Sequence, residues 1–268
     1  SIGDISFHIE EYDTAQVYFE RVLELDPEFE RSLQHLTWTY LRTDQIQTGY
    51  NMARRWADQT QSSEAYQYLG TAALMLGNNE EAITHYERAS EIAPKYAMPK
   101  RTLATAYLFS GDTGKSIATL QEIVDGDFKD RAKFEAFVAI AGNIMPYLGR
   151  FHEAMALANA GLDTLRALGK TEMVPELEVG LASLHFWAWK DLDIAWGLVE
   201  KTYDYPDSVK SMNYWMNLTA FNVVTGRVDE GMKIFEEHNK EKYVVPLFES
   251  LAAASSGDCS GAEALLDS

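Results

Sequence analysis

Small and apolar residues recur every three or four residues in the segment 63–96. This spacing is interrupted once, at Gly77, and then begins again. Seven positions carry this pattern: Leu69, Gly70, Gly77, Ala82, Tyr86, Ala89 and Pro94. Steps of three and four residues place side chains on one face of a helix. The pattern therefore predicts one helix, a tight turn at Gly77, and a second helix that ends before Pro94.

The residue types at these positions suit two helices that pack closely. Gly70 and Ala82 are small enough to let the two helix axes approach to about 8–10 Å. Tyr86 lies one turn after Ala82 on the same face, so its ring can fill the space between neighbouring hairpins. Gly77 tolerates the positive φ of a helix reversal, and Pro94 lacks the amide donor that would continue the second helix. We therefore expect residues 63–96 to form a helical hairpin.

The small residue that opens the second helix recurs along the whole chain. It stands at Ala15, Gly49, Ala82, Ser116, Ala154, Ala195, Gly231 and Ala262. The intervals are 34, 33 and 34 residues in the first half and 38, 41, 36 and 31 residues in the second half. These intervals predict about eight helical hairpins, which are regular at first and then more variable.

Two further positions recur at fixed distances before each of these residues. Twelve residues earlier, where the two helices should come closest, the residues are all small: Gly3, Thr37, Gly70, Ala104, Gly142, Ser183, Thr219 and Ser250. Five residues earlier, at the expected turn, most are glycine: Glu10, Asp44, Gly77, Gly111, Gly149, Lys190, Gly226 and Gly257. We expect Gly70, Gly142 and Ala195 in particular to face a neighbouring helix, and their exposure to water would contradict this prediction.

The unit of residues 63–96 resembles the tetratricopeptide repeat. That 34-residue helix–turn–helix carries a leucine–glycine pair and an aromatic residue in its first helix, and spaced alanine, aromatic and alanine residues in its second. The resemblance implies an all-α fold, a right-handed superhelical solenoid of stacked antiparallel helix pairs, with about eight copies of which the first and last are incomplete. We expect residues 1–130 to form a regular array with a truncated first copy. Residues 131–268 are expected to form longer, divergent repeats that continue the same solenoid.

The charge of the chain narrows the range of partners. Lys and Arg number 23 against 41 Asp and Glu, which gives a net charge of -18. Such a surface repels nucleic acid and anionic membranes, so we expect a protein or peptide partner of basic or apolar character. No apolar run approaches the roughly 18 residues of a membrane span, so membrane insertion is not expected. The single Cys259 cannot form an internal disulfide; it leaves the compartment open, with the cytoplasm slightly favoured, and the oligomeric state is open too.

Two short motifs imitate ligand sites but lack essential residues. Residues 111–116 end like a phosphate-binding loop, yet Phe109 stands where that loop needs glycine. Residues 125–130 resemble a calcium loop, yet Asp130 and Ala136 stand where that loop needs glycine and glutamate. The six histidines include no i, i+4 pair suited to a metal, and Cys259 has no histidine near it in the sequence. We expect no catalytic residue, no metal site and no cofactor.

The resemblance also implies where a partner would bind. In the tetratricopeptide family the first helices line a concave wall that usually holds an extended peptide or a partner helix. The register gives these candidate groove residues: Gln34, Trp38, Gln67, Thr71, Arg101, Thr105, Asn143 and Tyr147. A purely structural role for Trp38, packed against the next helix, stays open.

One subclass of the family clamps the acidic tails of chaperones with Lys and Asn in the first helix and a Lys–Arg pair in the third. Here Gln34, Trp38, Met98 and Thr102 occupy the matching positions, so that clamp is not expected.

The resemblance favours a non-catalytic module that binds a peptide or helix of a partner protein. The alternative is a sensory or regulatory portion of a longer signalling protein, such as a transcription regulator or kinase, because the start looks truncated and two repeats are long. An enzyme acting alone ranks third, since no acid–base pair, metal set or activated nucleophile is clustered in the sequence.

Overall fold

The structure is a computed structural model that describes residues 2–238; residues 1 and 239–268 lie outside the described part. The chain divides into two compact units, Ser1–Phe137 (unit 1) and Val138–Ser268 (unit 2). The described residues contain helices and no strand. An all-α fold is therefore confirmed for them.

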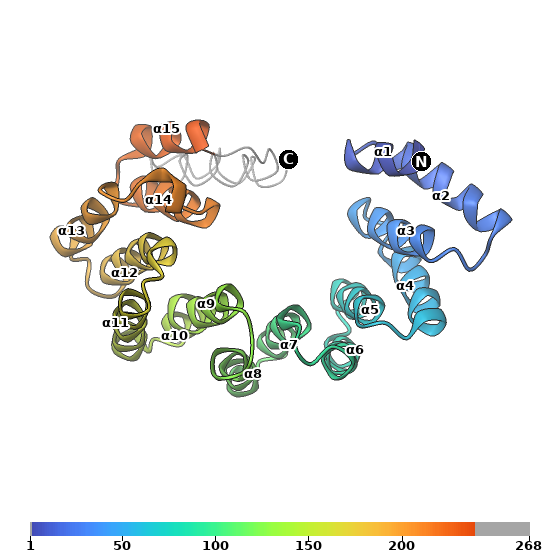
Figure 1. The fold of residues 1–268 in the computed structure, drawn as a ribbon, viewed down its shortest axis with the longest axis horizontal. Coiled ribbons are helices and arrows are strands. Elements are labelled where there is room, and N and C mark those ends of the chain that lie inside the picture. Colours follow the sequence, from blue (N-terminus) through green and yellow to red (C-terminus); the bar gives the residue numbers. More distant parts are fainter. Residues whose placement is uncertain (1, 239–268) are drawn as a thin grey trace. The chain divides into compact units, whose positions relative to one another are not determined.

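Unit 1 is a series of helices joined by short connections (Figure 1). They are α1 (Ile2–His8), α2 (Tyr12–Leu25), α3 (Glu30–Arg42), α4 (Ile46–Thr60), α5 (Ser63–Met75), α6 (Asn79–Ile92), α7 (Ala97–Phe109), α8 (Thr113–Asp125) and α9 (Asp130–Val138). The four predicted hairpins of residues 2–125 are present, and their helices pack in the pairs α1 with α2, α3 with α4, α5 with α6, and α7 with α8. The first helices α3, α5 and α7 lie on one side of unit 1, and the second helices α4, α6 and α8 lie on the other (Figure 1).

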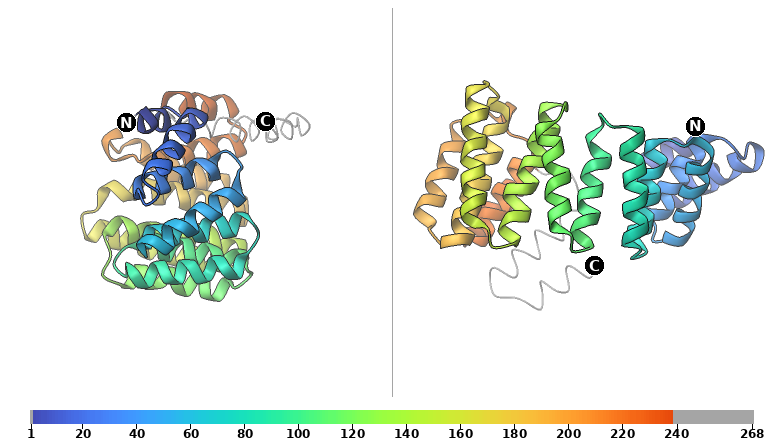
Figure 2. Two further views of the ribbon diagram at one scale, coloured as in Figure 1. Left: turned by 90° about the vertical axis from the view of Figure 1, so that its right-hand side faces the viewer. Right: turned by 90° about the horizontal axis from the view of Figure 1, so that it is seen from below.

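Unit 2 continues with longer and less regular elements, which the side views also show (Figure 2). They are the π-helix η1 (Ala139–Ile144), α10 (Met145–Tyr147), α11 (Phe151–Ala167), the 3₁₀-helix η2 (Thr171–Met173), α12 (Val174–Trp189), α13 (Leu192–Tyr203), the 3₁₀-helix η3 (Asp207–Val209), α14 (Met212–Val224) and α15 (Val228–His238). Helices α12 and α13 form one hairpin and α14 and α15 form another. No helix within residues 2–238 combines the length and apolar character needed to cross a bilayer.

The predicted small residues at the start of the second helices lie inside the hairpins. Every one that the structure describes is buried: Ala15, Gly49, Ala82, Ser116, Ala154, Ala195 and Gly231. A Cβ atom added to Gly70 would come within 2.9 Å of the ring of Tyr86, which is closer than real Cβ contacts. The small residues are therefore required by the approach of the two helices.

The predicted turn residues share one backbone conformation. All seven that the structure describes have positive φ: Glu10 63°, Asp44 60°, Gly77 79°, Gly111 83°, Gly149 71°, Lys190 55° and Gly226 90°. Glycine adopts this conformation without steric cost, which explains why it dominates the set. Glu10, Asp44 and Lys190 adopt it as well, so the tertiary fold sets the turn even where the residue type does not favour it.

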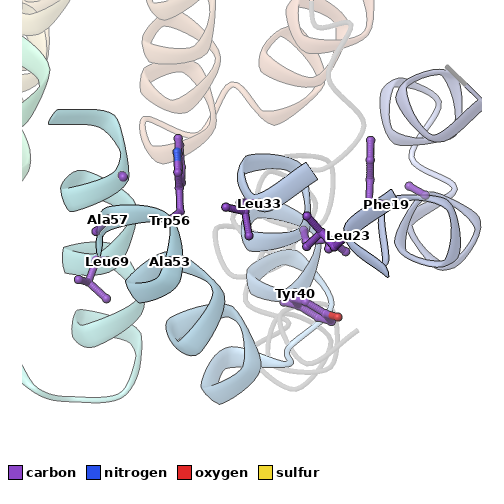
Figure 3. Close-up of a cluster of buried hydrophobic side chains, with 11 residues drawn as sticks. Phe19, Leu23, Leu33, Tyr40, Ala53, Trp56, Ala57 and Leu69 are labelled. Atoms are coloured by element: carbon purple, nitrogen blue, oxygen red, sulfur yellow. The ribbon is translucent and has the colours of Figure 1, made fainter. Parts of the chain in front are cut away.

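The core of the first three hairpins is a continuous cluster of apolar side chains (Figure 3). Phe19 and Leu23 of α2 meet Leu33 and Tyr40 of α3, and the cluster extends through Trp56 of α4. Helices α2, α4 and α6 therefore each pack both against the first helix of their own hairpin and against the first helix of the next one.

One predicted contact site is wrong. Gly142 is exposed, and the only side-chain atom near a Cβ added there is a Val138 methyl at 3.7 Å. Ala141 is buried in its place, and in the following hairpin Ala182 is fully buried while Ser183 is half-buried. Gly142 lies inside the π-helix, where an extra residue in the turn rotates the following side chains around the helix axis. The predicted sites at Ser250, Gly257 and Ala262 lie outside the described residues.

Candidate peptide-binding face

Six of the eight candidate residues belong to the first helices of unit 1. They occupy two equivalent positions on three first helices: Gln34 and Trp38 on α3, Gln67 and Thr71 on α5, and Arg101 and Thr105 on α7. We call this set the first-helix face. Helix α3 contacts α5, and α5 contacts α7, so the six positions form two neighbouring rows. Asn143 and Tyr147 belong to unit 2, where they lie exposed in η1 and α10.

Two aromatic side chains, Trp38 of α3 and Tyr68 of α5, contact each other on the first-helix face. We call this pair the aromatic step. The half-buried ring of Trp38 lies 5.3 Å from the ring of Tyr68, centroid to centroid, and Tyr68 in turn stacks 5.8 Å from the buried Trp56. The guanidinium of Arg42 lies 4.9 Å from the centre of the Trp38 ring. Trp38 therefore packs against the next hairpin while part of its side chain stays exposed.

Carboxylate and amide groups border this aromatic step. Gln34 donates from Nε2 to Oε1 of Glu64 at 2.8 Å, which links α3 to α5. Burial raises the pKa of Tyr68 to about 12, and the negative charge of Glu64 adds to this effect. Tyr68 therefore stays protonated at neutral pH and keeps a hydroxyl donor next to an aromatic surface.

The two threonines of the first-helix face, Thr71 and Thr105, differ in their hydrogen-bond partners and exposure. The hydroxyl of Thr71 lies 3.0 Å from the hydroxyl of Tyr86 and donates to the carbonyl of Gln67, so it is directed toward the second helix α6. Thr105 is exposed, and its hydroxyl donates to the carbonyl of Arg101 at 3.1 Å. Thr105 is thus accessible from outside, whereas Thr71 contributes mainly to the hairpin.

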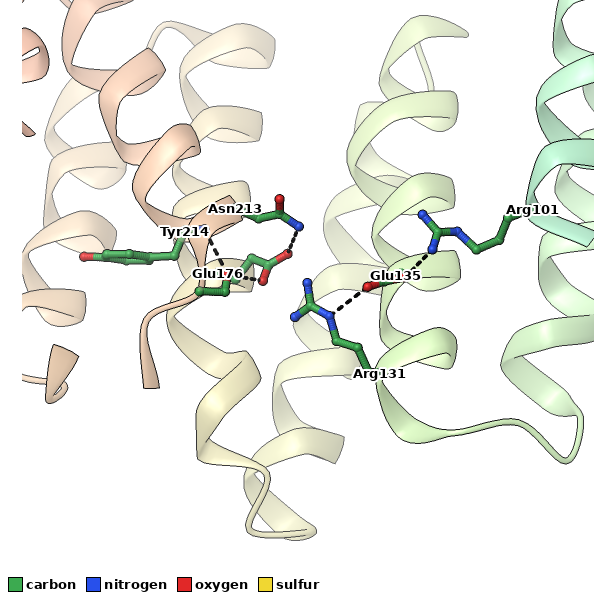
Figure 4. A network of polar contacts seen from close by, with 7 residues as sticks. Arg101, Arg131, Glu135, Glu176, Asn213 and Tyr214 are labelled. Atoms are coloured by element: carbon green, nitrogen blue, oxygen red, sulfur yellow. Dashed lines mark hydrogen bonds and ion pairs between the residues drawn. The ribbon is translucent and has the colours of Figure 1, made fainter. Parts of the chain in front are cut away.

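Arg101 is held in an ion pair at the α7–α9 part of the first-helix face (Figure 4). It donates to Glu135 of α9, and Arg131 donates to the other oxygen of the same carboxylate at 2.9 Å. Sequence reasoning missed Glu135, Glu64 and Tyr68. A sequence signal exists for each of them, because Glu135 follows Arg101 by 34 residues, and Glu64 and Tyr68 follow Gln34 and Trp38 by 30 residues.

The excess negative charge of unit 1 does not lie on the first helices. Helices α3, α5 and α7 carry these charged residues: Glu30, Arg31, Arg42, Glu64, Lys100 and Arg101. Helices α2, α6 and α8 carry more acidic than basic residues, whereas α4 carries Arg54, Arg55 and Asp58. The helices α3, α5 and α7 together carry four basic and two acidic residues, so the excess negative charge of unit 1 lies outside these three helices.

Residues 111–116 and 125–130, which resemble ligand-binding loops in the sequence, lie at the turns that connect α7, α8 and α9. Gly111 makes a turn, and the Asp112 side chain accepts from the Lys115 amide at 3.0 Å, which caps α8. Residues 126–129 join α8 to α9. Within residues 2–238 no cluster of three or more His, Cys, Asp or Glu side chains is arranged to hold a metal ion, and Cys259 lies outside this range.

Comparison with known protein families agrees with the helical repeat fold. Residues 9–89 match a family model described as anaphase-promoting complex, cyclosome, subunit 3, and residues 73–140 match the model of the tetratricopeptide repeat. No curated protein matches the chain. Both family matches lie almost wholly within unit 1.

Several solved structures are similar in fold. A tetratricopeptide repeat protein from Parabacteroides merdae is 12% identical, with a TM-score of 0.61 over 95% of this chain and 96% of that one. The C-terminal part of a repeat-containing protein from Cytophaga hutchinsonii is 14% identical, with a TM-score of 0.56 over 99% and 98%. The MamA protein is 24% identical, with a TM-score of 0.52 over 63% of this chain and 91% of that one. At these identities the likeness shows a shared fold.

Proposed function

Because the chain is a helical repeat protein of the tetratricopeptide family, we propose that it is a non-catalytic protein-interaction module whose partner lies across the first-helix face of unit 1. The partner segment is an extended peptide or a helix. Stacked helical hairpins present a broad surface built from equivalent positions, which suits a segment that contacts several repeats in turn.

The observation that carries this proposal is the aromatic step of Trp38 and Tyr68 with Gln34 and Glu64 beside it. Aromatic side chains that are partly exposed and held rigidly are typical anchors of protein interfaces. The neighbouring amide and carboxylate can orient the backbone of a bound segment by hydrogen bonds.

The distribution of charge favours an apolar partner segment for this face. The helices α3, α5 and α7 carry four basic and two acidic residues, so the excess of carboxylates in unit 1 lies outside them. The first-helix face therefore has no excess negative charge that would attract a basic segment. In unit 2 we keep Asn143 and Tyr147 as candidate contact residues of that unit by itself, since Tyr147 is a strongly exposed aromatic side chain.

A double substitution tests this proposal. Peptides selected from a displayed random library against the intact chain are titrated against the variant Trp38→Ala, Arg101→Glu. We expect their dissociation constants to rise about tenfold or more, because the aromatic anchor is lost and a cation becomes an anion. Helical content measured by circular dichroism should stay unchanged.

The matched control changes the second-helix face. Thr84→Ala combined with Arg88→Glu alters two exposed residues of α6 and should leave peptide affinity as it is. Equal affinity of the selected peptides for the Trp38 and Arg101 variant and for the unchanged chain would refute the first-helix face as the binding surface.

A further inference from the structure

Exposed side chains at the ends of three first helices continue the first-helix face toward the turns. Met75 and Phe109 are the last residues of α5 and α7, and they are 51% and 65% exposed. Arg42, the last residue of α3, takes the same place in the repeat and is exposed as well. Each of the three stands two positions before the turn residue of its hairpin. We call Arg42, Met75 and Phe109 the turn row.

The turn row lies on the same side of the helices as the first-helix face. Side chains four positions apart share one face of a helix, and each member of the turn row follows a residue of the first-helix face by four: Trp38, Thr71 and Thr105. The guanidinium of Arg42 accordingly lies over the Trp38 ring. The side-chain amide of Asn79 donates to the carbonyl of Phe109 at 3.5 Å, which brings the end of α7 next to the turn that follows Met75. The turn row therefore extends the first-helix face as a third row.

The exposure of the turn row does not come from a missing neighbour. Helices α3, α5 and α7 each pack against the second helix that precedes them and against the second helix that follows them. The residues that make these stacking contacts are buried, as at Leu36, Leu69 and Leu103. Met75 and Phe109 stay outside this packing, and neighbouring apolar side chains exposed in this way are a feature of interaction surfaces.

Arg42 differs from the other Lys and Arg residues of α3, α5 and α7 in its partners. Each of the others forms an ion pair: Arg31 with Asp4, Lys100 with Glu122, and Arg101 with Glu135. Arg42 donates to the hydroxyl of Tyr12 at 3.3 Å and lies over the Trp38 ring, and within residues 2–238 it forms no ion pair with a carboxylate. A carboxylate of a partner can therefore pair with Arg42 without displacing an ion pair of the chain.

The order of the turn row sets the pattern of the partner. Helix α3 contacts α5, and α5 contacts α7. Packed helices lie about 8–10 Å apart, and an extended chain rises about 3.3 Å per residue. An extended peptide that crosses the face therefore meets a new first helix about every three residues.

Taking the first-helix face as the binding surface, as proposed above, we propose that its partner is an extended peptide with one acidic residue and two apolar residues. The acidic residue pairs with Arg42. The two apolar residues lie to one side of it at intervals of about three residues, where they contact Met75 and Phe109. The turn row thus selects the chemistry of the partner, with charge at the α3 end and apolar contact at the α5 and α7 ends.

Peptides selected from a displayed random library against the intact chain supply the probes. We expect the selected sequences to share an Asp or Glu and two apolar residues about three positions apart. One selected peptide is then compared with the same peptide in which the acidic residue is changed to lysine. The lysine peptide should bind the unchanged chain about tenfold or more weakly.

Substitutions in the turn row complete the test. Arg42→Glu should reverse the preference, so that the lysine peptide binds this variant more tightly than the acidic peptide does. Met75→Ser and Phe109→Ser should each weaken the acidic peptide about fivefold or more, because an apolar contact is lost. Leu168→Ser is the matched control, since Leu168 at the end of α11 is 67% exposed, and it should leave affinity unchanged. Circular dichroism should show the same helical content in all four variants.

Three results would overturn the inference: a selection without the acidic residue, equal affinity of the acidic and lysine peptides for the unchanged chain, or unchanged affinity of Phe109→Ser. The variant Trp38→Ala, Arg101→Glu separates these results from a failure of the proposed function. Loss of affinity in that variant alone would keep the first-helix face and reject this partner chemistry. Unchanged affinity in every variant would refute the face itself.

Discussion

Replacing Ala82 with leucine is expected to lower the free energy of unfolding of unit 1 by about 1–3 kcal/mol. Ala82 is fully buried at the start of α6. One turn away, the ring of Tyr86 lies so close to Gly70 that a single added Cβ atom would come within 2.9 Å of it. A side chain three carbons larger than alanine can fit there only if the helices move apart, which loses contacts along the whole hairpin.

Ala118→Leu is the matched control for this prediction. Ala118 is an exposed residue of α8, two positions after the buried Ser116, so leucine there meets solvent instead of a neighbouring helix. Its effect on stability should stay within about 0.5 kcal/mol. Unfolding in urea, followed by circular dichroism, measures both variants. Equal stability of Ala82→Leu and Ala118→Leu would contradict the close approach of α5 and α6.

Replacing Arg166 with methionine is expected to destabilise unit 2 by about 3 kcal/mol at neutral pH. Glu178 of α12 is buried, and Arg166 of α11 donates to its Oε1 at 2.6 Å. Its other oxygen has no hydrogen-bond partner within the described part of the chain. Without Arg166, a buried carboxylate would lose its ion-pair partner, and methionine would keep the apolar stem of the arginine side chain.

The pH dependence of this pair follows from the carboxyl group. Burial raises the pKa of Glu178 above 4.5, its value in an unfolded chain, and Arg166 partly opposes this shift. The contribution of a group with a raised pKa is fully present below the unfolded value and is lost as pH rises through the folded value. The cost of Arg166→Met should therefore grow as pH rises from about 4.5 toward neutrality.

A second substitution, Glu178→Gln, tests the same mechanism at neutral pH, without an acid titration. Because the pI is about 4.7, the chain carries little net charge near pH 5, and association could obscure an acid titration. Glu178→Gln removes the buried charge, so the double variant Arg166→Met, Glu178→Gln should recover most of the lost stability at neutral pH. An unchanged stability of Arg166→Met, or no recovery in the double variant, would show that the buried charge does not matter.

The other buried carboxylate among the described residues of unit 2, Glu176, shows how such a group can be satisfied. Glu176 of α12 accepts from Ser211 Oγ at 2.7 Å and from Asn213 Nδ2 at 3.3 Å (Figure 4). These two oxygens are covered by polar groups at the start of α14. Glu178 lacks an equivalent set for its Oε2, which is why its pairing with Arg166 is the sensitive contact.

The sequence predicts the hairpins well because their geometry demands specific residue sizes at fixed intervals. The strongest example is the turn, since the register placed Glu10, Asp44 and Lys190 there, and all three adopt positive φ although none is glycine. The error at Gly142 has a local cause. A π-helix changes the number of residues per turn, so a fixed count from Ala154 reaches the wrong side of the helix.

The contacts of the candidate site could be predicted only in part. The register places Gln34, Trp38 and Arg101 on one side of their helices, but it does not specify which side chains they meet. Their partners follow at offsets of 30 or 34 residues: Glu64, Tyr68 and Glu135. An offset of 30 is one repeat less one helical turn, so a search for complementary pairs at both offsets would have found them.

The most direct test of the proposed binding surface uses a photoreactive residue at one of two threonines. Thr105 of α7 and Thr84 of α6 are both exposed, and each donates to the carbonyl four residues earlier at 3.1 Å. They differ in position, since Thr105 belongs to the first-helix face and Thr84 to a second helix. A photoreactive phenylalanine analogue replaces each in turn, and a library-selected peptide is added before irradiation. The account predicts a covalent product from position 105 and little from position 84; the opposite pattern would contradict it.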